Sequence, residues 1–141
     1  MPDFSKYSLA LFEGNRLIYS SQDKGLRPLW DFLEKHKEKY GLILHDKIIG
    51  LAAAKLIVYS KIISEVITMT ASVPAKKFLE DNGVIITACE VVTNIMTKDK
   101  SAICPGEVIA LNTEASDDFR RKIKTMLNGP AGISPIKLPD Q

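Results

Sequence analysis

The segment Cys104-Pro105-Gly106-Glu107 places a thiol and a carboxylate at the expected start of a helix. Proline suits the first turn of a helix, so Pro105 predicts that Cys104 takes the N-cap position. There the sulfur would face unpaired backbone N–H groups and the positive end of the helix dipole, which lower the pKa of a thiol. Cys104 is therefore a candidate catalytic nucleophile. The alternative is that the segment only starts a helix.

Glu107 has two interpretations. As an early residue of the helix it can cap the backbone of its own helix, as in a capping box, and its charge would then oppose formation of a thiolate. Alternatively, it handles protons for Cys104, which makes it a second catalytic candidate.

Asp46 and Lys47 end an apolar run of strand length and precede a long apolar segment. Asp46 is either the N-cap of a following helix or a catalytic candidate that orients a substrate or acts as a base. Lys47 is a candidate ligand-binding residue that would meet an anion beside the helix N-terminus. Gly50 would let that anion, or a neighbouring helix, approach closely.

Three further side chains have a chemical and a structural interpretation. Arg27 either clamps a carboxylate or phosphate at the mouth of the site or is a surface charge. His45 is expected to point inward as a core imidazole, with a role as a base as the alternative. Cys89 is expected to be a small buried hydrophobe within a strand.

The elements that must position these residues follow from hydrophobic spacing. Residues 7–12 and 16–20 are β-type runs around Glu13-Gly14-Asn15, which predicts a hairpin. Residues 26–40 have helical spacing, and Gly41 ends that helix. A strand over 42–45 follows.

Residues 48–63 are almost wholly apolar and predict a buried helix, interrupted by Lys55 and Lys61. The segment is shorter than the roughly 20 residues that a membrane span needs. A strand over 65–70 and a helix over 74–81 come next. The near-continuous hydrophobicity of 84–92 predicts a strand buried on both faces.

Two helices, one opening at Pro105 and one over residues 116–127, complete the order β-β-α-β-α-β-α-β-α-α. Strands separated by helices are largely parallel, so we expect an α/β protein, a three-layer α/β/α sandwich around a mixed sheet. Ligands of such sheets bind beyond the carboxyl ends of parallel strands. We expect one domain over 1–129 and an extended Pro-rich tail over 130–141.

Composition excludes several classes of protein. The 141 residues are 45% hydrophobic and 26% charged, typical of a folded soluble domain. With 19 Lys+Arg against 17 Asp+Glu, the net charge of +2 favours neither nucleic acid nor a membrane surface as a partner. Two cysteines and the lack of a basic-then-apolar leader predict a cytoplasmic protein. A homodimer is the default expectation.

Three motifs together resemble a family of uncharacterised bacterial and archaeal proteins, a domain of unknown function placed among cytidine-deaminase-like folds. They are Arg27-Pro28-Leu29, the run from Asp46 to Ala54, and Cys104-Pro105-Gly106-Glu107. The resemblance covers most of residues 5–112. It implies the three-layer α/β/α sandwich and supplies no established activity.

The zinc chemistry of deaminases requires H-x-E and P-C-x-x-C motifs, and the chain contains neither. Its soft ligands are His36, His45, Cys89 and Cys104, and no two cysteines are three residues apart. We therefore expect no metal and no cofactor.

The sequence thus predicts a small-molecule-binding protein of cytidine-deaminase-like fold without the zinc motif, with thiol-dependent chemistry at Cys104 if it is an enzyme. Asp46 or Glu107 would then handle protons. One alternative is a non-catalytic module that senses a metabolite or serves as an oligomeric scaffold. A second alternative is residual deamination of a nucleotide or nucleobase.

Overall fold

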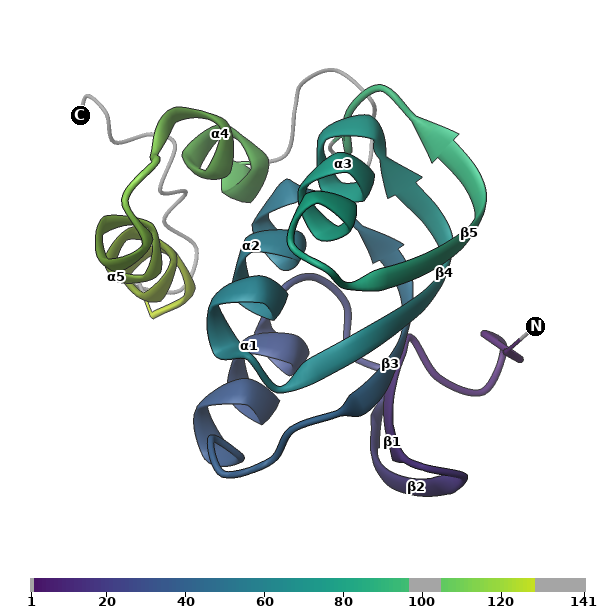
Figure 1. Cartoon of the computed structure of the whole chain (residues 1–141). Helices are drawn as coiled ribbons and strands as arrows, with labels where there is room; N and C mark the ends of the chain where they lie inside the picture. The colour runs from purple at the N-terminus through teal and green to yellow at the C-terminus, as the bar shows by residue number, and fades with distance from the viewer. Residues whose placement is uncertain (1, 97–104, 129–141) are drawn as a thin grey trace.

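The computed structural model describes residues 2–96 and 105–128, and this part of the chain contains five strands and five helices in the order β-β-α-β-α-β-α-β-α-α (Figure 1). The strands are β1 (Leu9–Glu13), β2 (Arg16–Ser21), β3 (Leu42–Ile49), β4 (Ile63–Ser72) and β5 (Ile85–Val92). The helices are α1 (Arg27–Lys35), α2 (Leu51–Ser60), α3 (Val73–Asp81), α4 (Pro105–Asn112) and α5 (Ser116–Leu127). The predicted order of elements and the α/β class are confirmed.

The five strands form one mixed sheet in the order β2-β1-β3-β4-β5. The predicted hairpin pairs β1 with β2 antiparallel, and its turn contains Gly14 at a φ of 62°. Strand β1 is also antiparallel to β3, whereas β3, β4 and β5 are parallel. The parallel half arises because α2 and α3 each return the chain to the same end of the sheet.

All five described helices lie on one side of the sheet (Figure 1). The connections β2-α1-β3, β3-α2-β4 and β4-α3-β5 all advance across the sheet in one direction. Right-handed crossovers that advance in one direction place their helices on one face, and helices on both faces need a reversal. Among the described residues no helix lies on the second face, where the three-layer prediction placed helices, and α4 and α5 pack on α2 instead.

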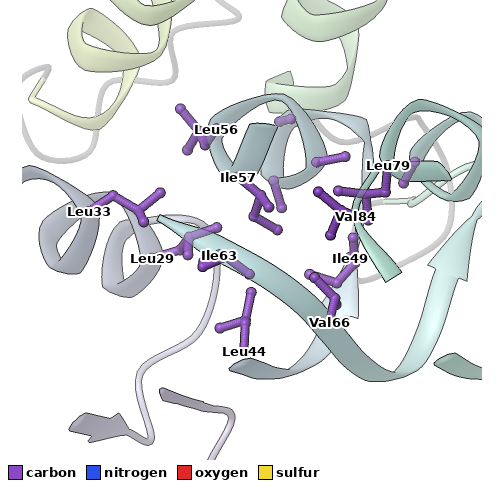
Figure 2. Packing of buried hydrophobic residues seen from close by; sticks show 14 of the residues in the cluster. Leu29, Leu33, Leu44, Ile49, Leu56, Ile57, Ile63, Val66, Leu79 and Val84 are labelled. Carbon is purple, nitrogen blue, oxygen red and sulfur yellow. The ribbon is translucent and has the colours of Figure 1, made fainter. Parts of the chain in front are cut away.

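The hydrophobic core lies between the sheet and this helical layer (Figure 2). Leu44 and Val66, which are register partners on the central strands, are fully buried beneath Ile57 of α2 and Leu79 of α3. Helix α2 is buried over its first seven residues, as its apolar composition predicts. No described helix has the length and apolar character needed to cross a bilayer.

Strand β5 corrects the prediction that residues 84–92 are buried on both faces. It is an edge strand of the sheet, and Ile85 and Val91 are 63% and 44% exposed. Helix α3 packs on one face of β5, so only the side chains directed at that helix, such as Ile86, join the core. Cys89, expected to be buried, is exposed for the same reason.

Candidate functional site

The buried helix α2 has no polar side chain at its own N-cap position. The N-cap position is Gly50, which is extended at φ −99° and ψ −177°, and no side-chain cap comes from this residue. Strand β3 runs on to Ile49, so Asp46 lies inside the strand and is not the N-cap. Because the first backbone N–H groups of a helix lack partners within the helix, they need an acceptor from elsewhere in the fold.

Glu107 of α4 supplies that acceptor across 56 residues of sequence. Its Oε1 accepts a hydrogen bond from the Leu51 N–H at 2.6 Å, and its Oε2 accepts one from the Ala52 N–H at 2.8 Å. The side chain is only 5% exposed. Glu107 was expected to cap its own helix or to handle protons; here its carboxylate caps α2, where an anion is favoured by the helix dipole.

Gly50 makes this contact possible. A Cβ atom at residue 50 would lie 2.5 Å from Cδ and Oε2 and 2.6 Å from Oε1 of Glu107. Such distances are well inside van der Waals contact, so any larger residue would push the carboxylate away from the Leu51 and Ala52 amides. The close approach expected at Gly50 is thus made by a carboxylate of a neighbouring helix.

Burial raises the pKa of Glu107, while the hydrogen bonds from Ala52 and Leu51 act in the opposite direction. Desolvation is the larger effect, because a carboxylate in a low-dielectric interior loses the solvation of its charge. The helix end therefore offsets part of the cost of burying this acid.

A buried lysine of α2 joins the same two helices at the C-terminal end of α4. Lys55 of α2 is 7% exposed, and its Nζ donates to the carbonyl oxygens of Ala110 and Thr113, both at 2.7 Å. These carbonyls end α4, where a cation is favoured. Burial lowers the pKa of Lys55, and the charge of Glu114 opposes that shift. The sequence signal was a lone lysine inside an otherwise apolar helix.

Asp46 lies on the central strand β3 beside Thr68 of β4, its register partner. It is half-buried, and Thr68 is fully buried. Burial raises the pKa of Asp46 from 3.8 to about 8, against the opposing effect of hydrogen bonds from the backbone of Ile48 and Lys47. A carboxyl group with a raised pKa keeps its proton to higher pH, and in the protonated form it can donate as well as accept a hydrogen bond.

Lys47 points away from Asp46. Successive side chains of a strand point to opposite faces, and Lys47 and Ile48 are both exposed before Ile49 is buried again. Strand β4 has the same burial pattern: Thr68 and Ala71 are fully buried, and the two residues between them are more exposed than either. Asp46 and Lys47 do not form the joint site that adjacency in sequence suggested.

Two of the remaining candidates, His45 and Arg27, make their contacts elsewhere in the fold. His45 is half-buried; its Nδ1 is 3.0 Å from the Tyr7 hydroxyl, and burial lowers its pKa. Arg27 donates to the backbone oxygen of Leu127 and to Oδ1 of Asn128, which ties α1 to the end of α5. Cys104 lies outside the described residues.

Gly50→Ala tests the helix cap. Displacement of the Glu107 carboxylate leaves two buried N–H groups without their acceptor, so the free energy of unfolding should fall by about 1–3 kcal/mol. Denaturation by urea measures it. Gly106→Ala is the matched control, because a Cβ there would meet Met126 and Ala52 only at ordinary distances of 3.6 and 3.7 Å. Equal stability of the Gly50→Ala variant and the wild type would contradict the assignment.

Asp46→Asn tests the raised pKa through stability. The folded-state pKa of about 8 lies above the unfolded value of 3.8, so the stability linked to protonation is complete below pH 4 and is lost as the pH rises toward 8. The free energy of unfolding of the asparagine variant, relative to that of the wild type, should therefore rise by at least about 1 kcal/mol between pH 5 and pH 9. Asp81→Asn, on the surface of α3, should show no such trend. Parallel pH profiles for Asp46→Asn and the wild type would exclude a raised pKa.

Comparison with known proteins agrees with this fold. Nothing among the curated proteins matches the chain. A crystal structure from Thermotoga maritima, described as a DUF1893 family protein (TM1506), superposes with a TM-score of 0.77 at 26% identity over 86% of this chain and 83% of that one. The family model for TM1506, a domain of unknown function (DUF1893), matches residues 4–127. The chain therefore belongs to the DUF1893 family.

Proposed function

We propose that this protein binds a small molecule at the helix-covered end of β3, within a cytidine-deaminase-like architecture that works without zinc. The observation that carries the proposal is Asp46, a carboxyl group on a central parallel strand whose pKa is raised to about 8. Groups with strongly shifted pKa values gather at functional sites, because binding and proton transfer near pH 7 require them.

The position of Asp46 supports a binding role. It is four residues before Gly50, near the end of β3, and ligands of parallel sheets bind beyond the carboxyl ends of their strands. By alternation along β3 it shares a face with Leu44, which lies in the core beneath the helices. A protonated carboxyl group here would donate a hydrogen bond to a carbonyl oxygen or ring nitrogen of the ligand.

The mixed sheet, with an antiparallel hairpin beside three parallel strands, supports the cytidine-deaminase-like architecture as part of the proposal. The residues do not fit the zinc of that fold class. The starts of helices α2 and α3 carry Gly50-Leu51-Ala52 and Ser72-Val73-Pro74, which offer no His, Cys or Glu. Glu107 binds the α2 backbone amides. Among the described residues no three His, Cys, Asp or Glu side chains gather as a metal site.

Variants of Asp46 test the proposed binding role. Ribonucleosides and free nucleobases serve as probes, and their binding is measured from the ¹⁵N chemical shifts of backbone amides around Asp46 and Thr68. Wild-type affinity should fall as the pH rises through 8. Asp46→Asn keeps a donor and should bind without this pH dependence, whereas Asp46→Ala should lose about tenfold in affinity, the worth of one hydrogen bond.

Asp81→Asn serves as the control for charge and should bind like the wild type. If no probe shifts the resonances around Asp46, or if Asp46→Ala binds as tightly as the wild type, the proposed site is wrong.

Cys104 is the proposed nucleophile if this protein catalyses a reaction. It directly precedes Pro105, the first residue of α4, and the Glu107 carboxylate hydrogen-bonds to α2. In a Cys89→Ser background, the rate of iodoacetamide alkylation should follow an apparent thiol pKa below the reference of about 8.5.

Cys104→Ser provides the comparison, because it leaves the exposed Cys89 as the reacting thiol. If the thiols of the two variants react with the same pH profile, Cys104 has no activated thiolate.

A further inference from the structure

The face of the sheet that points away from the helices carries several apolar side chains along its parallel strands. Register pairing places Glu65 between Ile43 and Ile85, and Ile67 between His45 and Thr87. Ile43 and Ile67 are half-buried, while Ile85 and Met69 are 63% and 39% exposed. We call this surface, made by Ile43, Ile67, Met69 and Ile85, the open face.

Parallel sheets are ordinarily covered on both faces, because each strand presents apolar side chains to both sides. On this side of the sheet Figure 1 shows, among the described residues, only the N-terminal segment. Phe4 of that segment packs edge-on against Tyr7, which hydrogen-bonds to His45, so the segment shields β3 near β1. No helix of the described ranges covers strands β4 and β5 on this side.

Two opposite charges flank the centre of the open face. The row of His45, Ile67 and Thr87 crosses the middle of the open face. Glu65 of β4 lies on one side of this row, between Ile43 and Ile85. Lys47 of β3 lies on the other side, two residues beyond His45. A two-fold axis in the plane of contact, running past Ile67 between these charges, exchanges their positions. Two copies stacked in this way form two ion pairs around an apolar centre.

We infer that a second copy of this chain covers the open face, with each Glu65 opposite the partner's Lys47. A two-fold interface must be complementary to itself, and an apolar patch flanked by one acid and one base meets that requirement. A third charge, Glu90 on the edge strand β5, accepts a hydrogen bond from Thr70 within the chain. The inference is independent of the binding site proposed at Asp46, which points to the other face.

Charge reversal tests the inference in solution. Light scattering coupled to gel filtration should give the wild type twice the 15.6 kDa mass of the chain. Glu65→Lys and Lys47→Glu each replace two attractions by two repulsions, so each should raise the dimer dissociation constant about tenfold or more. The double variant restores opposite charges and should recover most of the wild-type affinity. Lys24→Glu and Glu38→Lys, at exposed positions of loops, should dimerise normally.

A dimer that is insensitive to both single reversals, or that the double variant does not restore, overturns the inference, since the copies then meet elsewhere, for example through the edge of β5. A monomer at all concentrations also overturns it. If Met69 of such a monomer resists oxidation by peroxide, another part of the same chain covers the open face; if it is oxidised rapidly, the face is bare.

Discussion

The fold depends on a reciprocal contact between α2 and α4, in which each helix satisfies one end of the other. The Glu107 carboxylate of α4 binds the amides that open α2, and the Lys55 ammonium of α2 binds the carbonyls that end α4. Each charge meets the helix end of opposite sign, and each satisfies backbone groups that are buried. Helix α2 has no capping side chain at Gly50, so its burial requires α4 in this position.

This contact also sets the surroundings of the candidate site. Helix α2 begins directly after β3, and its Ile57 lies in the core above Leu44 of the sheet (Figure 2). The packing of α4 on α2 therefore holds the helical layer above the end of the sheet. The start of a helix after a parallel strand is a common place for a bound anion. Here a carboxylate of the chain itself, that of Glu107, occupies this place. Asp46, whose pKa burial raises, lies nearby toward the end of β3.

The order of the elements could be predicted because its signals are local. Gly14 and Asn15 mark the hairpin, and the apolar run around Lys55 marks a buried helix. The partners of Glu107 and Lys55 could not be predicted, because each contact joins residues more than 50 positions apart and depends on how the helices pack. The burial expected for β5 was wrong because hydrophobicity does not reveal whether a strand lies at the edge of a sheet. Asp46 and Lys47 are adjacent in sequence, but a strand directs neighbouring side chains to opposite faces.

The most direct test of the helix contact follows the amide protons of Leu51 and Ala52 by NMR as the pH is varied. If Glu107 caps α2, both amide resonances titrate together with one pKa above the 4.5 of an ordinary glutamate, and Glu107→Gln abolishes that titration while the folded spectrum remains. Amide shifts that do not change with pH, or that titrate unchanged in Glu107→Gln, would show that this carboxylate does not hold the start of α2.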